Sequence, residues 1–304
     1  MANLDLIVRA LRTQCPGLEI LEHEPMRAHC SFRIGGPARA LVRPASAEET
    51  AAVCRIVRGG GAQPLIIGNG TNLLITDGAL ERIVVQMGDN MAAVTQPDAT
   101  HLSAGAGIPL ARLAQAALGC GLAGLEFAHG IPGSLGGAVS MNAGAYGGEM
   151  KDVVVSCRYI TEKGDIKEIP LEKMELSYRH SFFSERNLCI TSVKMKLAKG
   201  EREKIKDRMD TLMERRKDKQ PLEYPSAGST FKRPEGDFAA RLIEVCGLKG
   251  TACGGAEVST KHSGFIINKD NATFNDVMGV VDIVKQRVKE QTGVTLECEV
   301  LIMK

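Results

Sequence analysis

The sequence predicts an α+β fold in three successive parts, and three of its features carry this prediction. Short apolar runs such as 64–67 end in glycine-rich loops, which is where nucleotides bind in α/β sheets. Two strand-like runs at 153–161 and 166–169 flank Glu162-Lys163-Gly164-Asp165, a hairpin signal. After Gly200 a charged helical segment leads into a mixture of short helices and strands. We therefore expect three parts, covering residues 1–90, 91–200 and 201–304.

Composition places the chain among ordinary soluble globular proteins. Of the 304 residues, 44% are apolar and 24% charged, and the net charge is +2, which does not favour nucleic acid or a membrane surface as a partner. The first 17 residues predict an amphipathic helix and not a secretory signal. Nine scattered cysteines form no Cys-x-x-Cys pair, so we expect no metal site and mostly buried thiols in a reducing cytoplasm.

Local patterns predict the individual elements. Ser46 and Glu49 form a capping-box pattern for a helix at 48–58 that ends at three glycines. Lysines alternate with Val193, Met195 and Leu197, which indicates a half-exposed strand at 188–198. The remaining expected strands are 38–42, 64–67, 83–87, 102–107, 264–268 and 296–303, and the remaining helices are 108–118, 201–219, 239–246 and 274–291.

Residues 124–150 hold eight glycines and almost no charge. The stretch is too irregular for a helical period and too rich in glycine for an ordinary strand. Such a cluster indicates either a tight structural core or a close backbone approach to an extended ligand, such as a nucleotide or flavin. A second glycine loop, 68–74, has Leu73 in place of the third glycine of a dinucleotide fingerprint. It is either a simple turn or a nest of backbone N–H groups for an anion.

Three residues stand in contexts that suit catalysis. Arg179 lies among aromatic residues, which can hold a guanidinium against developing negative charge. Ser229 follows Ala227-Gly228, and a serine hydroxyl on a small-residue turn can act as a proton donor. Glu299 shares one face of the expected last strand with Glu297, and it matters chemically only if that face lines a site.

An ordered set of motifs runs through nearly the whole chain. A single glycine motif would be unspecific, but this set closely resembles the flavin-dependent UDP-N-acetylenolpyruvoylglucosamine reductase (MurB) family, and its shorter, type II subgroup in particular. The matching segments are Ser31–Gly36, Gly68–Leu74, Gly130–Gly137, Asn142–Gly147, Tyr178-Arg179, Ala227–Lys232 and Leu296–Val300.

The resemblance implies an FAD-binding fold of the vanillyl-alcohol-oxidase type. Its two α/β subdomains would occupy 1–90 and 91–200, and an α+β substrate-binding domain would occupy 201–304. The implied reaction is the NADPH-dependent, FAD-mediated reduction of UDP-N-acetyl-3-O-(1-carboxyvinyl)-glucosamine to UDP-N-acetylmuramate, in cytoplasmic peptidoglycan synthesis. Hydride would come from the reduced flavin and the proton from a serine. The partner would be this nucleotide sugar, without nucleic acid, membrane or an obligate protein.

The resemblance also implies individual roles. Ser229 would donate the proton, and Arg179 and Glu299 would polarise the substrate carboxylate and stabilise the intermediate. Substrate would be bound by Tyr146, Tyr178, Lys219 and Lys232, the two lysines facing the UDP phosphates. FAD would be bound by Ile34, Gly35, Gly68, Asn69, Gly70, Thr71, Asn72, Leu73, Gly130, Gly133, Ser134, Gly136, Gly137, Asn142 and Gly144.

Two departures qualify the resemblance. The longer subgroup has a substrate-clamping loop with a tyrosine, and no counterpart segment is visible here. Residues 68–74 contain no histidine or cysteine, so we expect non-covalent FAD, with His129 a backbone-bonded histidine near the flavin. An FAD-dependent alcohol oxidase remains an alternative, against which Ser229 and Glu299 argue. A flavin-carrying module without turnover is another.

Overall fold

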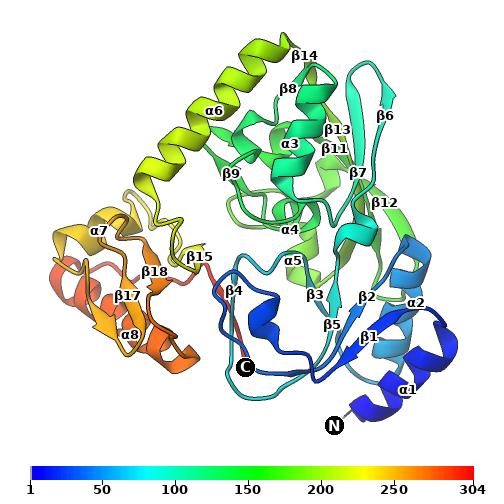
Figure 1. The fold of residues 1–304 in the computed structure, drawn as a ribbon, viewed down its shortest axis with the longest axis horizontal. Coiled ribbons are helices and arrows are strands. Elements are labelled where there is room, and N and C mark those ends of the chain that lie inside the picture. The colour runs from blue at the N-terminus through cyan, green and yellow to red at the C-terminus, as the bar shows by residue number, and fades with distance from the viewer. Residues whose placement is uncertain (1) are drawn as a thin grey trace. The chain divides into compact units, whose positions relative to one another are not determined.

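The computed structural model describes residues 2–304, which form two compact units (Figure 1). Unit 1 comprises residues 2–23, 38–69 and 81–214, and unit 2 comprises 24–37, 70–80 and 215–304. Both units are therefore assembled from discontinuous segments. The three-part division into 1–90, 91–200 and 201–304 stays a prediction about domain organisation.

The N-terminal part of unit 1 is a four-stranded sheet with two helices. The strand order is β1 (Glu19–Glu22), β2 (Ala38–Arg43), β5 (Leu80–Gln86) and β3 (Leu65–Ile67). Helix α1 (Leu4–Gln14) packs on α2 (Ala47–Gly59). Ser46 Oγ accepts the Glu49 N–H at 3.0 Å, which confirms the predicted cap, but the Glu49 carboxylate accepts from Ala45 N, one residue before the cap.

A five-stranded antiparallel sheet forms the rest of unit 1 (Figure 1). Its order is β12 (Ile166–Pro170), β11 (Val154–Ile160), β13 (Cys189–Lys196), β7 (His101–Gly105) and β6 (Val94–Asp98). The predicted hairpin is confirmed by the pairing of Ile160 with Ile166. The expected alternation of β13 is confirmed, with Val193 and Met195 buried and Lys194 and Lys196 on the more exposed face, and the strand lies between two neighbours in the sheet. Lysine-rich alternation alone does not distinguish a central strand from an edge strand.

Helices cover this sheet and complete one apolar core. Helix α4 (Leu135–Ser140) packs on β13 and β7 and contacts α3 (Leu110–Gly119), while α2 packs on β11 and β12. The expectation that 124–150 holds no helix is wrong, because tertiary packing of Leu135 and Val139 compensates for two glycines inside α4. The smaller elements of unit 1 are α5 (Phe182–Arg186), β8 (Leu122–Ala123), β9 (Gly144–Ala145), β10 (Gly148–Glu149) and β14 (Ala198–Lys199).

Helix α6 (Arg202–Lys219) confirms the predicted charged helix. Its narrow apolar stripe includes Ile205 and Met209, which join the core of unit 1. Burying such a side chain contributes about 1.5–3 kcal/mol, so this stripe holds one face of the otherwise polar helix against unit 1. Short 3-10 helices elsewhere are η1 (Met26–Ala28), η2 (Asp89–Met91), η3 (Glu126–Ala128), η4 (Met150–Asp152) and η5 (Leu171–Lys173).

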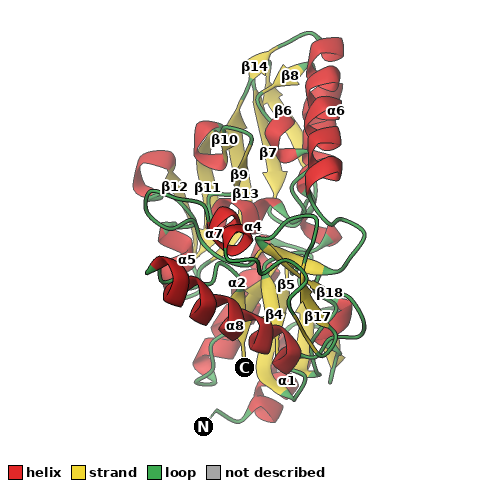
Figure 2. Cartoon of the chain, turned by 90° about the vertical axis from the view of Figure 1, so that its left-hand side faces the viewer, coloured by secondary structure: helices red, strands yellow, loops and turns green. Residues whose placement is uncertain are grey.

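Unit 2 is built around a four-stranded sheet. The order is β15 (Ser226–Ser229), β18 (Phe265–Asn268), β17 (Ala256–Val258) and β16 (Ala252–Cys253), and α8 (Phe274–Thr292) packs along it beside α7 (Ala239–Val245; Figure 2). Strand β4 (Leu73–Ile75) pairs in parallel with β19 (Leu301–Met303). The last strand was expected over 296–303, but only its final three residues pair regularly, because their partner β4 is itself three residues long.

The cysteines and the helices agree with an ordinary globular chain. Within residues 2–304 all nine cysteines are free, and five of them are buried, as expected. No helix of the described chain is long and apolar enough to cross a membrane.

Candidate functional site

Gly68 and Ser134, two of the predicted cofactor-binding residues, lie close together in unit 1. Gly68 directly follows β3, and a Cβ atom there would lie 1.8 Å from Ser134 Oγ. Ser134 is the N-cap residue of α4, but its hydroxyl makes no capping hydrogen bond and is buried without a partner. Gly68 is therefore required by the position of Ser134.

A second buried polar atom nearby in sequence also lacks a partner, Nδ1 of His129. The expectation of a backbone-bonded histidine is wrong for this nitrogen. Buried polar atoms are normally hydrogen-bonded, and the few exceptions often mark an absent ligand. Two such atoms in the 124–150 stretch fit a wall that receives a ligand with hydrogen-bonding groups, as FAD has.

The glycines at 133, 136, 137 and 144 differ in whether the surrounding protein leaves room for a side chain. A Cβ on Gly136 would lie 2.8 Å from Ala106 Cβ, and one on Gly144 would lie 2.7 Å from Glu149 Cγ, so protein packing requires both. Gly137 is exposed, and its Cβ would meet only Ser134 Oγ at 3.6 Å. Gly133 has a φ of 129° and its carbonyl accepts from Leu110 N. Protein packing therefore explains the glycines at 136 and 144 but not the glycine at 137.

The 68–74 loop is divided between the two compact units. Gly68 and Asn69 belong to unit 1, whereas Gly70 to Leu73 belong to unit 2. Gly70 has a φ of 60°, and a Cβ there would lie 2.1 Å from the His29 carbonyl oxygen. Asn72 uses its side-chain amide to bond the Glu299 carbonyl at 3.1 Å, and its own carbonyl accepts from Leu301 N. In unit 2 this loop thus fixes the segment that carries Glu299.

Ser229 and Glu299 come together within unit 2. Ser229 ends β15 just after Gly228, whose φ is 77° in an irregular stretch of the pairing with β18. The Glu299 N–H donates to the Thr230 carbonyl at 2.8 Å, and Phe231 pairs with Cys298 in an antiparallel bridge. The residue after the serine is therefore bonded directly to the glutamate's backbone. Both side chains are partly exposed, so a substrate can reach them.

Other predicted residues of unit 2 have simpler surroundings. Ile34 is buried, and its carbonyl accepts a hydrogen bond from Cys30 Sγ at 3.1 Å. A Cβ atom added to Gly35 would lie 3.0 Å from Met26 Cβ. Segments 33–37 and 268–273 line a cavity of about 700 Å³. Lys232 pairs with Glu297 at 3.2 Å, and Lys219 is exposed at the end of α6.

In unit 1, Tyr146 and Arg179 each lie in a two-residue turn. Tyr146 and Gly147 connect β9 to β10 with φ values of 54° and 88°. Tyr178 and Arg179 connect the bridged pair Ser177 and His180, with the Arg179 guanidinium carbon 5.1 Å from the Tyr178 ring centroid and a φ of 55° at Arg179. Backbone in the left-handed region is unusual for such residues and concentrates at functional sites.

Glu149, a residue that sequence reasoning did not single out, lies beside these turns. Its pKa is lowered mainly by a hydrogen bond from Lys151 and then by one from Asn142, with a smaller contribution from the charge of Arg179. The predicted cofactor residue Asn142 is itself buried, with a φ of 43°. No local sequence signal marks Glu149, because Tyr-Gly is not one of the dipeptides that typically indicate a two-residue hairpin turn.

One group of potential metal ligands is present among the described residues. Ligand atoms of Glu175, His180 and Glu185 lie within 4.8 Å of one another, with His180 Nδ1 3.8 Å from Glu185. The two glutamates are exposed, and exposed acidic groups commonly meet without an ion.

Two family models match this chain. Residues 38–170 match the family model described as an FAD binding domain, and residues 220–303 match the C-terminal domain of UDP-N-acetylenolpyruvoylglucosamine reductase. These matches confirm the predicted fold class, an α+β chain with an FAD-binding domain and a distinct C-terminal domain.

Proteins named UDP-N-acetylenolpyruvoylglucosamine reductase are similar over the full chain. The protein from Syntrophomonas wolfei is 48% identical over 95% of this chain and 96% of its own. The one from Clostridioides difficile is 44% identical over 100% and 99%. The crystal structure of the Thermus caldophilus enzyme superposes with a TM-score of 0.79 at 33% identity, covering 94% of this chain and 99% of that one. This chain belongs to the UDP-N-acetylenolpyruvoylglucosamine reductase family.

Proposed function

We propose that this chain catalyses the NADPH-dependent, FAD-mediated reduction of UDP-N-acetyl-3-O-(1-carboxyvinyl)-glucosamine to UDP-N-acetylmuramate in peptidoglycan synthesis. Membership of the reductase family and the FAD-binding domain support this assignment. We further propose that it works in the cytoplasm as an NADPH-using enzyme with a nucleotide sugar as its small-molecule partner.

The observation that carries the proposal is the pairing of the Ser229 and Glu299 segments. The bond from Glu299 N to the Thr230 carbonyl joins the segments that carry Ser229 and Glu299. A partly exposed serine hydroxyl is suited to protonating a carbon of a substrate that is bound within its reach. The Asn72 amide strengthens this arrangement by holding the Glu299 carbonyl.

The proposed chemistry divides the work between cofactor and chain. FAD, when bound, supplies hydride transfer from NADPH to the terminal enolpyruvyl carbon. Addition there leaves negative charge on the neighbouring carbon and the carboxylate attached to it. Ser229 Oγ then gives its proton to that carbon, while Arg179 and Glu299 polarise the carboxylate and stabilise the intermediate. The double bond becomes a single bond, with one hydride and one proton added.

The residues that would hold FAD fit that group. Ser134 Oγ and His129 Nδ1 offer buried, unpartnered atoms, and exposed Gly137 allows a close approach to its backbone. We propose non-covalent binding by the wall at 130–144 and the loop at 68–73. Tyr146 and Tyr178, both exposed, are proposed to bind substrate, and Lys219 and Lys232 to face its phosphates.

Ser229→Ala tests the assignment of the proton donor. We expect reduction of the enolpyruvyl substrate to slow by about a hundredfold or more, the usual contribution of a general acid, because no other group replaces the hydroxyl. NADPH oxidation by the FAD-loaded variant should stay near the wild-type rate. Both rates are measured by stopped-flow absorbance of the flavin.

Ser226→Ala is the matched control on the same strand. Its structural contact uses the backbone carbonyl, which accepts from Ser31 Oγ at 2.6 Å and remains after substitution. Its two rates should therefore equal those of the wild type. If Ser229→Ala slowed both half-reactions equally, the proton-donor role would be excluded, and a wild-type protein without substrate reduction would exclude the proposed activity.

A further inference from the structure

The turns that carry Tyr146 and Arg179 are connected by one buried side chain, Asn142. Its Nδ2 donates to Glu149 Oε2 at 2.8 Å and to the Ser177 carbonyl at 3.2 Å, and its Oδ1 accepts from Lys151 N at 2.9 Å. Glu149 closes the Tyr146 hairpin through its pairing with Gly144. Ser177 begins the Arg179 turn and bonds His180 in both directions at 3.2 Å.

These bonds use both donors of the Asn142 amide. A carboxamide has two N–H groups, and here one serves each turn. The residue is 1% exposed, and both of its donors are engaged within the protein. The φ of 43° explains why asparagine occupies the position, since it tolerates the left-handed region better than most residues.

Glu149 contributes more than a hydrogen-bond acceptor. Its carboxylate also accepts the Asp152 N–H in a capping box and pairs with Lys151 Nζ at 2.9 Å. The positive charge of Arg179 stabilises its ionised form. By the same interaction, the fixed carboxylate attracts the guanidinium of Arg179, which is always charged.

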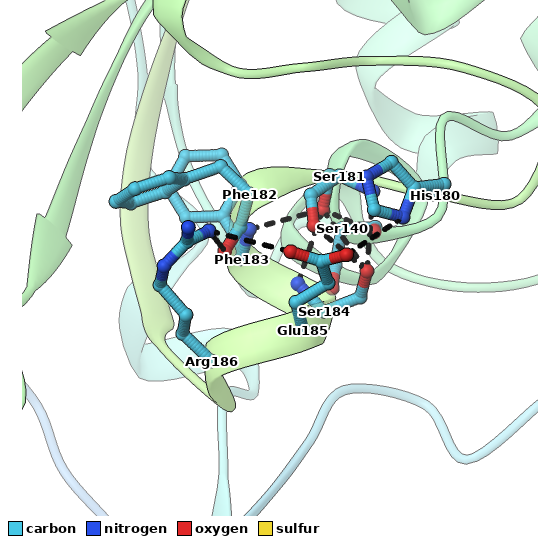
Figure 3. Close-up of polar contacts among 8 residues, drawn as sticks. All are labelled: Ser140, His180, Ser181, Phe182, Phe183, Ser184, Glu185 and Arg186. Atoms are coloured by element: carbon cyan, nitrogen blue, oxygen red, sulfur yellow. Dashed lines mark hydrogen bonds and ion pairs between the residues drawn. The ribbon is translucent and has the colours of Figure 1, made fainter.

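The other end of the Arg179 turn is held separately. Ser181 Oγ donates to the Ser140 carbonyl at 2.5 Å and caps α5 by accepting from Ser184 N (Figure 3). Ser140 ends α4, so this contact ties the turn to the helix behind the wall. Asn142 and Ser181 therefore flank Tyr178 and Arg179, one on each side.

We propose that Asn142 and Glu149 are positioning residues that hold the Tyr146 and Arg179 turns in one fixed arrangement. This inference rests on the proposed function, because it assigns Arg179 to the substrate carboxylate. Neither residue takes part in bond making. They act by fixing the backbone that positions Arg179. Their loss should therefore slow the reduction of the enolpyruvyl substrate, the step to which the guanidinium is assigned.

Asn142→Asp tests the proposal with minimal change of shape. Aspartate keeps the acceptor for Lys151 N and tolerates the positive φ, but it lacks both donors and faces Glu149 with a like charge. We expect kcat for substrate reduction to fall by about a hundredfold, as for a misplacement of about 1 Å. Glu149→Gln, which keeps the size but removes the charge, should lower kcat less, by about tenfold.

Amide hydrogen exchange of the protein without substrate gives a readout independent of activity. In Asn142→Asp, the peptide containing Ser177 and His180 should exchange about tenfold faster, because the carbonyl that anchors the turn loses its side-chain donor. In the double variant with Glu149→Gln, the glutamine amide can donate to the aspartate, so the hairpin peptide at 144–149 should recover its protection. The 177–180 peptide should not recover.

Lys151→Met is the matched control, since it removes the ion pair with Glu149 but leaves the Asn142 bonds intact. Its exchange and kcat should match the wild type. Wild-type exchange and wild-type kcat in Asn142→Asp would overturn the inference. If the wild type itself failed to reduce the substrate, the proposed function would be wrong, while the exchange result would still decide whether Asn142 holds both turns.

Discussion

Arg179 adopts a φ of 55°, a conformation that side chains with a Cβ atom normally avoid. The left-handed region costs about 1–2 kcal/mol for a residue other than glycine. Tyr146 and Asn142 share this property, and all three are in or beside the turns assigned to substrate binding. On the proposed function, this strain is retained because the arginine side chain is needed at this position.

Arg179→Gly and Arg179→Ala should therefore differ in stability although both lose the guanidinium. Alanine keeps the backbone strain, whereas glycine relieves it and so stabilises the folded state. Glycine also increases the conformational entropy of the unfolded chain, which offsets part of this stabilisation. We expect the glycine variant to be more stable than the alanine variant by about 1 kcal/mol, and both to lose substrate reduction. Denaturant unfolding curves measure the difference, and an alanine variant of equal or greater stability would contradict the strain argument.

His262 gives the fold a dependence on pH. Burial lowers its pKa below the usual 6.5, and Nδ1 accepts the Gly264 N–H at 3.2 Å, a bond that only the neutral ring can make. Because the unfolded chain takes up the proton more readily, the contribution of the neutral ring is present above about pH 6.5 and is lost as the pH falls.

His262→Asn should flatten this dependence, since the asparagine oxygen can accept the same N–H without titrating. Unfolding free energies at pH 7.5 and 5.5 provide the measurement, and the wild type should lose more stability than the variant on acidification. His23→Asn, a change at an exposed position that also tolerates the φ of 54°, is the control. An equal loss in wild type and His262→Asn would exclude His262 as the source.

Helix α4 shows two adjacent glycines with different roles. Gly136 lies against Ala106, whereas exposed Gly137 has space for a methyl group. Alanine is preferred over glycine in helices by about 0.8–1.0 kcal/mol. Packing therefore decides whether alanine stabilises or destabilises the protein at Gly136, and helix propensity decides this at Gly137.

Gly136→Ala should destabilise the protein without FAD, because its Cβ would lie 2.8 Å from Ala106 Cβ. Gly137→Ala should leave that protein as stable as the wild type or slightly more so, yet lower its affinity for FAD if the exposed backbone is the wall that FAD meets. Thermal unfolding and flavin titration, both on flavin-free protein, separate the effects. Unchanged FAD affinity in Gly137→Ala would remove this residue from the proposed wall.

Elements with a strong local pattern could be predicted from the sequence, as the cap of α2 and the hairpin of β11 and β12 demonstrate. Helix α4 could not, since its glycines oppose helix formation and only packing on β13 and β7 overcomes them. The central place of β13 and the short β19 depend on partner strands far away in sequence. Local periodicity contains no information about such partners.

The candidate site also depends on long-range pairing across each unit. Motifs identified Ser229 and Glu299, but the bond between Glu299 and Thr230 joins segments about 70 residues apart, and no spacing rule predicts it. Glu149 has no motif signal of its own and became visible only beside Asn142 and Ser177. Residue types were thus predictable, whereas the contacts that orient them required the folded chain.

At the scale of the whole molecule, burial sorts the nine thiols by reactivity. Five are buried, and burial raises the pKa of each, to about 11 for Cys54, so few of them are thiolates at neutral pH. Three are partly exposed, and Cys120 is the only exposed cysteine among the described residues 2–304. A folded chain should therefore show one rapid thiol and several slow ones.

Titration with a disulfide reagent such as DTNB at pH 8 should give one fast equivalent in the native protein and nine in denaturant. Cys120→Ser should remove the fast phase and leave the total at eight. Since the nine cysteines are free, adding a reductant should leave the unfolding midpoint unchanged. More than four fast equivalents in the native protein would exceed the one exposed and three partly exposed thiols. The apolar core would then open readily, because only local unfolding brings buried thiols such as Cys54 and Cys189 to the reagent.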